Sequence, residues 1–281
     1  WMPTSSLLLS ADAAVYYNNV KSEDKSPFHI GDNYNLGRVE CNLNLSAKYR
    51  PVKNLSLSAV LREECYKRDF VPVIPALFAE YQIPLKSSPS REVRRGVILK
   101  ASVARNYRYP TMDDLYFKPG GNTELKPEQG FTYDGGIEGY LQTKSYSLKV
   151  NLSAFDSYIT DWILWTPNAR GYWQPSNLKK VHNYGTEMMV TAELKMRHQW
   201  KISLTGNYAY TPSINKSDKL DANDASYGKQ LVYVPRHSAN LNGRLSWRTW
   251  SLSYQWTYYS ERFTTTSIEV SYITGRLKPY Y

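Results

Sequence analysis

Residues 200–210 read WKISLTGNYAY, and this stretch decides the fold class because its side chains alternate between two kinds. One set is aromatic or aliphatic with a single glycine, and the other is polar apart from Ala209. Successive side chains of a β-strand point to opposite faces, so the stretch predicts a strand with one apolar and one polar face. Its apolar face has aromatic residues at the ends and aliphatic residues between them, which is typical of strands that cross a bilayer.

The same alternation returns along the whole chain, and it predicts about twelve strands. The expected strands are 6–18, 34–50, 53–67, 73–84, 94–108, 129–142, 145–162, 179–196, 199–211, 230–248, 249–262 and 267–281. Several are longer than the ~9–11 residues that a membrane strand needs. We therefore expect them to project beyond the bilayer.

Tight and long connections largely alternate between these strands. The tight ones are 50–54, 142–145, 196–200 and 247–250, and the long polar ones are 19–33, 109–128, 166–178 and 211–229. Alternate turns of an up-and-down sheet lie at the same end. The pattern predicts an all-β, antiparallel transmembrane barrel, with short periplasmic turns and long extracellular loops. We expect residues 1–281 to form a single domain of such a barrel.

The composition agrees with a membrane barrel whose interior is polar. The mean hydropathy of the 281 residues is −0.55, and 25 Tyr and 8 Trp outnumber 7 Phe. Aromatic residues with a polar tip suit a membrane interface better than a dry core. The net charge of +10 is compatible with basic residues spread over loops or in contact with anionic lipid headgroups. No nucleic-acid motif accompanies it, so we expect no nucleic-acid partner.

No arrangement of residues indicates catalysis, a resident metal or a cofactor, so we expect a protein that is not an enzyme. Acidic residues gather in two long loops, as Asp113, Asp114, Glu124 and Glu128 and as Asp218, Asp221 and Asp224. Each group could hold a cation, but solvated loops with helix-capping acids are the preferred interpretation.

The two cysteines, Cys41 and Cys65, fall on neighbouring expected strands that are joined near residues 51–54. Counting back from that turn places them almost opposite each other and on the same face. A disulfide in an oxidising compartment and a pair of free thiols both remain open.

Aromatic residues in the long loops are the candidates for ligand contact. Tyr109, Tyr116, Tyr172 and Trp173 are expected to lie on extracellular loops, where they could stack on a ligand. For Trp162 and Trp165 the interfacial aromatic girdle is the alternative.

Residues 102–128, SVARNYRYPTMDDLYFKPGGNTELKPE, resemble the signature of TonB-dependent outer-membrane receptors. In that family a strand ends in an aromatic-Arg-x-Pro step, Leu-Tyr follows, and Asn-x-x-Leu-x-Pro-Glu leads into the next strand. The matching positions here are Arg108, Pro110, Leu115, Asn122, Pro127 and Glu128. The stretches 155–165 and 183–194 are similar to the strands that follow in the family, although a glycine of the second pattern is replaced near Val190.

The resemblance implies a 22-stranded barrel in the outer membrane of a Gram-negative bacterium, filled by an N-terminal plug. Such a receptor imports cobalamin, an iron-siderophore or haem with energy delivered by TonB, and its partners are outer-membrane lipid and, in some cases, a surface lipoprotein. A passive porin and a SusC-like glycan importer are the alternatives. Trp1 is not a translation start, and neither plug nor closing strands are evident. We therefore expect a piece of a longer protein with about twelve of the 22 strands.

Overall fold

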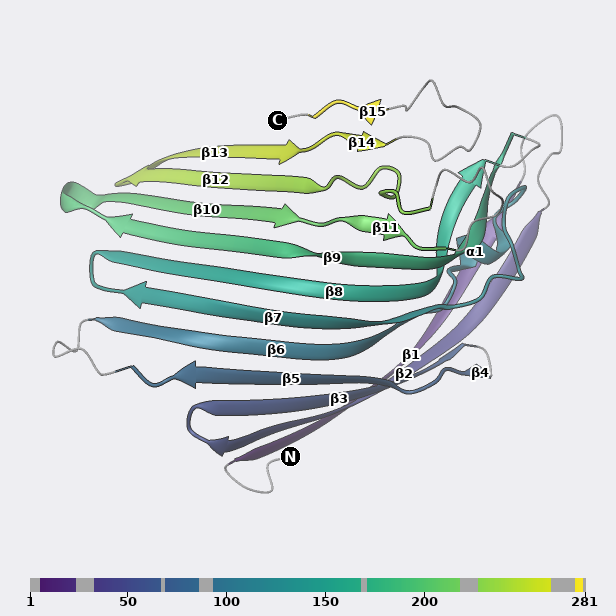
Figure 1. Ribbon diagram of the computed structural model, residues 1–281, viewed down its shortest axis with the longest axis horizontal. Helices are drawn as coiled ribbons and strands as arrows, with labels where there is room; N and C mark the ends of the chain where they lie inside the picture. Colours follow the sequence, from purple (N-terminus) through teal and green to yellow (C-terminus); the bar gives the residue numbers. More distant parts are fainter. Residues whose placement is uncertain are drawn as a thin grey trace.

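The computed structural model describes residues 6–23, 33–66, 69–85, 93–167, 171–217, 227–263 and 276–279. Most of them form one strongly curved antiparallel sheet with residues 7–22 and 250–259 at its opposite edges, and residues 262–263 and 276–277 pair in a second, two-stranded sheet (Figure 1). Every main strand of the curved sheet pairs with the next main strand along the chain.

The main strands of the sheet are long, and small elements fill the connections. The main strands are β1 (Leu7–Ser22), β2 (Tyr34–Val52), β3 (Leu55–Tyr66), β5 (Ile74–Ile83), β6 (Arg94–Arg108), β7 (Glu128–Gln142), β8 (Tyr146–Pro167), β9 (Trp173–Lys195), β10 (Trp200–Tyr210), β12 (His237–Trp247) and β13 (Trp250–Tyr259). The small elements are β4 (Asp69–Phe70), the helix α1 (Met112–Tyr116), the 3-10 turn η1 (Arg197–Gln199), β11 (Ser213–Asn215), β14 (Arg262–Phe263) and β15 (Arg276–Leu277).

The predicted all-β antiparallel architecture is confirmed, with three corrections to the strand bounds. The loop expected at 166–178 is largely a continuation of the β8–β9 hairpin, in which Pro167 pairs with Trp173. The strand expected to begin at residue 230 begins at His237, because Tyr233 has φ 61° and breaks the extended backbone. Of the strand expected at 267–281, residues 276–277 form β15, and 267–275 and 280–281 lie outside the described residues.

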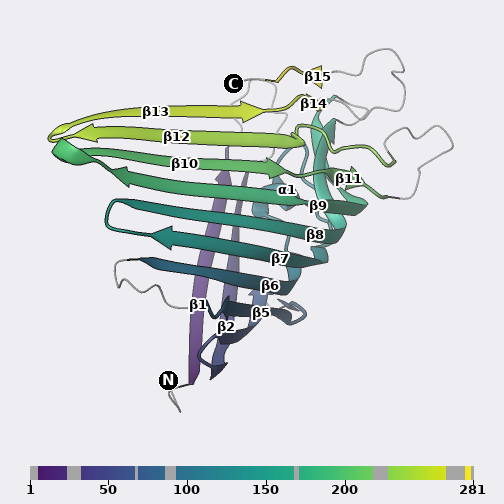
Figure 2. The same cartoon turned by 60° about the vertical axis from the view of Figure 1, so that its left-hand side comes forward.

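The strand register carries one apolar face across the whole sheet. One row of paired residues consists of Tyr81, Leu99, Ile137, Leu152, Met188 and Tyr208. Each of them is between 41 and 44% exposed. A face that is so apolar and so exposed is stable against hydrocarbon rather than water. The sheet curves through part of a cylinder without closing, as Figure 2 shows from a second side.

The opposite face is polar and is held together by cross-strand contacts. Lys100 Nζ and Lys149 Nζ lie 2.6 and 2.9 Å from the carboxylate of Glu138. Asn106 donates to Thr132 Oγ1 at 2.5 Å, and that hydroxyl donates to Ser157 Oγ at 2.8 Å. In a barrel, this is the face that lines the interior.

Cys41 and Cys65 are direct partners in the β2–β3 register, on the apolar face. The two residues form a disulfide with their Cα atoms 5.1 Å apart. The bridge ties β2 to β3 near the end of the sheet where β4 folds back, with Phe70 opposite Cys65.

The two ends of the sheet differ as the connections predict. The tight connections β2–β3, β7–β8, β9–β10 and β12–β13 lie at one end, which we call the turn end (left in Figure 1). The β3–β5, β6–β7, β8–β9 and β10–β12 connections lie at the other, the loop end, together with α1. Within the described residues, no helix has the length and apolarity needed to cross a bilayer.

The apolar face gives a direct prediction for membrane insertion. Leu152→Arg in the complete protein should cost roughly 2–4 kcal/mol of folding free energy in lipid, because the charge would enter the hydrocarbon. Asn151→Arg, one residue away on the polar face, is the matched control and should fold as the wild type does. Refolding into vesicles, followed by the mobility difference between folded and unfolded barrels on gels, measures both, and equal yields would contradict the assignment of the two faces.

Candidate functional site

The candidate site is the loop of residues 109–127, which joins β6 to β7 at the loop end (Figure 1). A hydrophobic cluster lies beneath it, formed by the buried side chains of Leu115, Leu125 and Ile163. Tyr109 and Tyr116 pack against this cluster. Few side chains of the sheet itself are buried, so this loop is packed unusually well for a surface connection.

Arg108, the last residue of β6, closes the base of the loop. Its guanidinium donates to both oxygens of Glu128, its register partner on β7, with Nε to Oε2 at 2.9 Å. A third contact joins Nη1 to Asp114 Oδ2 at 3.4 Å. Glu128 also accepts a hydrogen bond from the backbone N–H of Ile163 at 2.8 Å, which brings β8 into the same network. The fork-shaped guanidinium thus holds two buried carboxylates at once.

Asp114 is the centre of the network inside the loop. Thr111 caps α1 and Asp114 completes a capping box, with the two residues exchanging hydrogen bonds at 3.0 and 3.1 Å. The second carboxylate oxygen accepts a hydrogen bond from the indole Nε1 of Trp165 at 2.9 Å. Trp165 therefore anchors the loop from β8, and its expected alternative place in the lipid-facing girdle is wrong.

Two asparagines fasten the far side of the loop to the β8–β9 hairpin. Asn177 pairs with the backbone of Lys126, accepting from its N–H and donating to its C=O at 2.9 Å each. Asn122 donates to the carbonyl of Pro175 at 3.3 Å. Gly120 lies so close to the hairpin that a Cβ on it would stand 2.0 Å from the carbonyl oxygen of Trp173. The loop and the hairpin tip are therefore packed backbone to backbone.

A third attachment comes from β2, distant in sequence. The guanidinium of Arg38 is buried and donates to the carbonyl of Pro110 at 2.9 Å, while Glu40 neutralises it at 2.6 Å. The rings of Tyr66 and Tyr109 stack with centroids 4.1 Å apart, and the Arg38 guanidinium lies 5.2 and 5.4 Å from them. This cation–π arrangement joins the first strands of the sheet to the loop.

The site brings together most of the predicted signature residues. Arg108, Asn122 and Glu128 are in the polar network, Leu115 is in the hydrophobic cluster, and Pro110 is fully buried with its carbonyl bound by Arg38. Pro127 stands directly before Glu128 and lies between the backbone of Lys126 and the start of β7. The local motif thus marks a structural network rather than a row of ligand contacts.

The four predicted aromatic candidates occupy different environments. Tyr109 and Tyr116 are partly buried, and one face of Tyr109 is covered by Tyr66. Tyr172 is half-buried in the bend before β9. Trp173 is the first residue of β9 and 51% exposed, and so it is at a hairpin tip rather than in the middle of a long loop. Phe117, which sequence reasoning did not single out, is 47% exposed and packs edge-on against Trp165.

Two of the four acidic residues of this segment, Asp114 and Glu128, serve the fold. Asp114 is a helix-capping acid, as the preferred interpretation predicts. The carboxylates of Asp114 and Glu128 both form ion pairs with Arg108. Among the described residues, no group of three or more His, Cys, Asp or Glu side chains is arranged to hold a metal ion. Residues 218–226, with the second acidic group, lie outside the described part of the chain.

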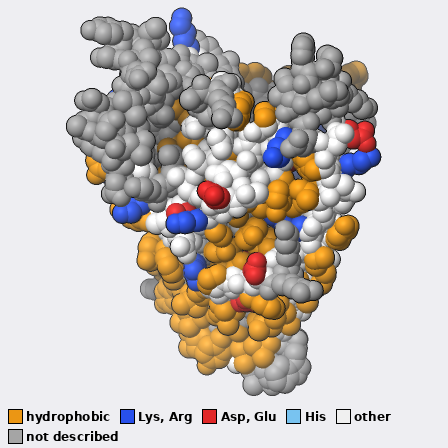
Figure 3. All heavy atoms as spheres, turned by 90° about the vertical axis from the view of Figure 1, so that its right-hand side faces the viewer, with side chains coloured by type: hydrophobic (Ala, Val, Ile, Leu, Met, Phe, Trp, Pro, Cys, Tyr) orange, Lys and Arg blue, Asp and Glu red, His pale blue; other side chains and the backbone are white. Residues whose placement is uncertain are grey.

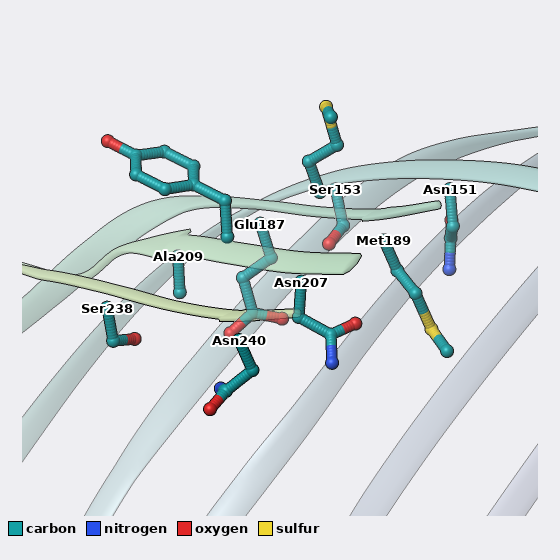
Figure 4. Close-up of a pocket in the computed structure, with 10 residues that line it drawn as sticks. Asn151, Ser153, Glu187, Met189, Asn207, Ala209, Ser238 and Asn240 are labelled. Atoms are coloured by element: carbon teal, nitrogen blue, oxygen red, sulfur yellow. The ribbon is translucent and has the colours of Figure 1, made fainter. Parts of the chain in front are cut away.

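A shallow cavity of about 280 Å³ lies on the polar face of β8, β9, β10 and β12 (Figure 4). Its polar lining consists of Asn151, Ser153, Glu187, Asn207, Ser238 and Asn240. These side chains offer both hydrogen-bond donors and acceptors, with a single carboxylate among them. In a closed barrel they would face whatever fills the interior.

Fold and site together define a class of protein: part of a membrane-spanning β-barrel with a firmly anchored loop at its loop end, the mouth of the barrel. The family described as "TonB dependent receptor-like, beta-barrel" matches residues 3–281, and the chain belongs to this family. Its members are receptors and transporters of the Gram-negative outer membrane rather than enzymes.

Several characterised proteins are similar to parts of this chain. The vitamin B12 transporter BtuB of Photobacterium profundum is 25% identical over 191 residues, covering 65% of this chain and 28% of its own. BtuB of Vibrio vulnificus is 30% identical over 149 residues, covering 51% of this chain and 22% of its own. The siderophore receptor PirA from Acinetobacter baumannii has the same fold, with a TM-score of 0.62 at 15% identity over 99% of this chain and 45% of its own. The chain therefore spans less than half of these relatives.

The loop network gives a prediction for local stability. Glu128→Gln in the complete protein should raise hydrogen exchange in residues 109–127, because the buried carboxylate of Glu128 loses its charged hydrogen bonds with Arg108, at a cost of about 2 kcal/mol. Asp113→Asn is the matched control, since Asp113 is exposed in the same loop. Exchange measured by mass spectrometry should rise only in the first variant and only near the loop.

Asp114 makes the loop sensitive to acid. Burial by itself would raise the pKa of Asp114, but hydrogen bonds from Thr111 and Trp165 and the charge of Arg108 hold that pKa below its usual range. A carboxyl whose pKa is lowered on folding stabilises the fold above its unfolded pKa, near 3.9, and loses that contribution as the pH falls through the folded pKa.

We therefore expect proteolysis of the loop to increase as the pH is lowered below about 4 and to be insensitive to pH above about 5. An acid-tolerant protease such as pepsin measures the change. Asp114→Asn should be cleaved faster at every pH and should show a weaker dependence on acid. A variant with the same acid profile as the wild type would show that another group causes the transition.

Proposed function

We propose that the chain forms part of the barrel of a TonB-dependent receptor that imports a scarce, bulky nutrient across the outer membrane. The nutrient classes are cobalamin, an iron-siderophore or haem, with energy coupled from the inner membrane through TonB. The chain is a single domain of this barrel in the outer membrane of a Gram-negative bacterium. The plug and the segment that binds TonB belong to the rest of the protein, and a surface lipoprotein is a further partner.

The observation that carries the proposal is the anchored loop of residues 109–127. The exposed ring of Phe117 packs on Trp165, which is bound to this network, and the exposed Trp173 adjoins the loop at Gly120, which supports both as ligand contacts. Aromatic faces of this kind can stack on a large planar or conjugated ligand, such as a corrin, a catecholate or a porphyrin. Holding them in place before binding reduces the entropy cost of capture.

Similarity to relatives supports the nutrient class. Two of the relatives are vitamin B12 transporters, and a protein with the same fold is a siderophore receptor. The polar cavity on β8–β12 supports a filled interior, because its amide and hydroxyl groups suit a folded plug as a partner. A passive porin has no need of such a plug, and a SusC-like glycan importer would be expected to bind oligosaccharides in preference to corrinoids or iron chelates.

Trp173→Ala in the complete receptor should leave folding unchanged and weaken nutrient binding about tenfold, since an aromatic contact is worth roughly 1–1.5 kcal/mol. The matched control is Trp250→Ala, an exposed tryptophan at the opposite end of the sheet. Binding is measured by titrating cyanocobalamin, a ferric catecholate and haem in parallel. Equal affinity in the wild type and the Trp173 variant would remove Trp173 from the site.

The same titrations test the proposed function itself. Binding of one of these three ligands, together with uptake that stops when TonB is absent, is the expected result. Uptake that continues without TonB would identify a porin, and selective binding of oligosaccharides would identify a glycan importer.

A further inference from the structure

We propose that the turn end of the barrel binds the headgroups of anionic phospholipids in the leaflet that it faces. The inference goes beyond nutrient import. It needs the barrel to lie in a membrane but does not depend on which ligand is carried or on energy coupling.

The turn end carries a one-sided charge. The described turn-end segments are 50–54, 93–95, 142–146, 195–199 and 247–250. None of them contains Asp or Glu, so their Lys and Arg side chains are all that carry charge. They are Arg50, Lys53, Arg94, Arg95, Lys144, Lys195, Arg197 and Arg248. All of them are exposed. Much of the net charge of +10 therefore gathers on this rim.

The loop end does not share this bias. The loop of residues 109–127 has Asp113, Asp114 and Glu124 beside Lys118 and Lys126. Figure 3 looks onto this end and shows acidic and basic side chains near one another at several points. The asymmetry is therefore a property of the turn end and not of surface charge in general.

Interfacial tryptophans stand beside these cations. Trp200 and Trp247 pair in register on the apolar face, with ring centroids 5.5 Å apart, and Trp250 follows on β13. Trp250 is 73% exposed on that face. The guanidinium of Arg248 lies 5.1 Å from the ring centre of Trp247. Tryptophan marks the level of lipid headgroups, so Arg248 is held at the depth of the phosphates.

Three of these cations, Arg95, Arg197 and Arg248, are the best placed for lipid, whereas Lys195 is paired with Glu193 at 3.6 Å. Arg95 is opposite Leu141 in the register, on the face that also carries Leu99 and Ile137. No carboxylate of the described residues lies within ion-pair distance of Arg197 or Arg248. Phosphate oxygens next to the apolar face would satisfy these donors without removing them from the interface. A soluble acidic protein would have to reach the same groups across the lipid surface.

The attraction between such a rim and anionic lipid is electrostatic and so depends on salt. Each basic residue near an anionic surface strengthens association several-fold, and the effect decays within a Debye length of about 10 Å at 0.1 M salt. The preference for an anionic headgroup over a zwitterionic one should therefore be large in dilute buffer and small in concentrated salt.

The test uses the complete protein in vesicles of phosphatidylcholine and phosphatidylglycerol, with bromine on the acyl chains of one lipid at a time. Quenching of tryptophan fluorescence then reports which lipid surrounds the barrel. The variant Arg95→Gln/Arg197→Gln/Arg248→Gln keeps every tryptophan. The matched control, Lys216→Gln/Lys229→Gln/Arg236→Gln, removes three exposed cations at the loop end. Gel mobility of the folded barrel confirms that each variant has folded.

Wild type and control should prefer phosphatidylglycerol by about fivefold at low salt, and the preference should approach one in about 0.5 M NaCl. The turn-end variant should show a clearly smaller preference at low salt, because three of the eight basic side chains are gone, and a preference near one in about 0.5 M NaCl. An unchanged preference in that variant overturns the proposal. If that variant instead loses binding of an acidic periplasmic protein while its lipid preference is unchanged, the rim is a protein-docking surface and the proposal is also overturned.

Discussion

Backbone pairing within hydrocarbon is the constraint on which the rest of this structure depends. A peptide N–H or C=O that faces lipid without a partner costs several kcal/mol, because no water is present to replace it. The chain meets this requirement by pairing each main strand with its neighbours in sequence, from β1 to β13. With the backbone groups hydrogen-bonded in this way, the apolar side chains can face lipid and the polar side chains can face the interior. Within the described residues, β1 and β13 are the two edges of the sheet, where backbone groups are not paired by a neighbouring main strand.

The sequence predicted most of this architecture because alternation is a local property that each strand carries by itself. The strand expected at 199–211 is β10, Trp200–Tyr210, and the tight connections at 142–145 and 247–250 are where they were expected. The β8–β9 hairpin was harder to predict. Pro167 and Pro175 favour a loop, yet both are accepted near the tip of the hairpin, where the loop of residues 109–127 packs against it.

The candidate site was predictable only in part, for a different reason. Arg108 and Glu128 are 20 residues apart in a recognisable motif, and they are register partners. Arg38 and Asn177 reach the same loop from β2 and β9, and neither belongs to any local pattern. Trp165 gave the wrong signal, because a tryptophan near the end of a membrane strand is usually at the lipid interface. Contacts between distant strands depend on how the sheet curves, and alternation carries no information about that curvature.

The attachment of the loop to the β8–β9 hairpin has a mechanical consequence. β8 and β9 have 22 and 23 residues, roughly twice the length that spans a bilayer. The paired strands therefore extend well beyond the membrane as a stiff β-hairpin. Gly120, Asn122 and Asn177 fix the loop to the tip of that hairpin at several points. The loop and the tip must then move as one rigid body. Any closure of the mouth over a captured ligand would pivot about this body, with other segments supplying the motion.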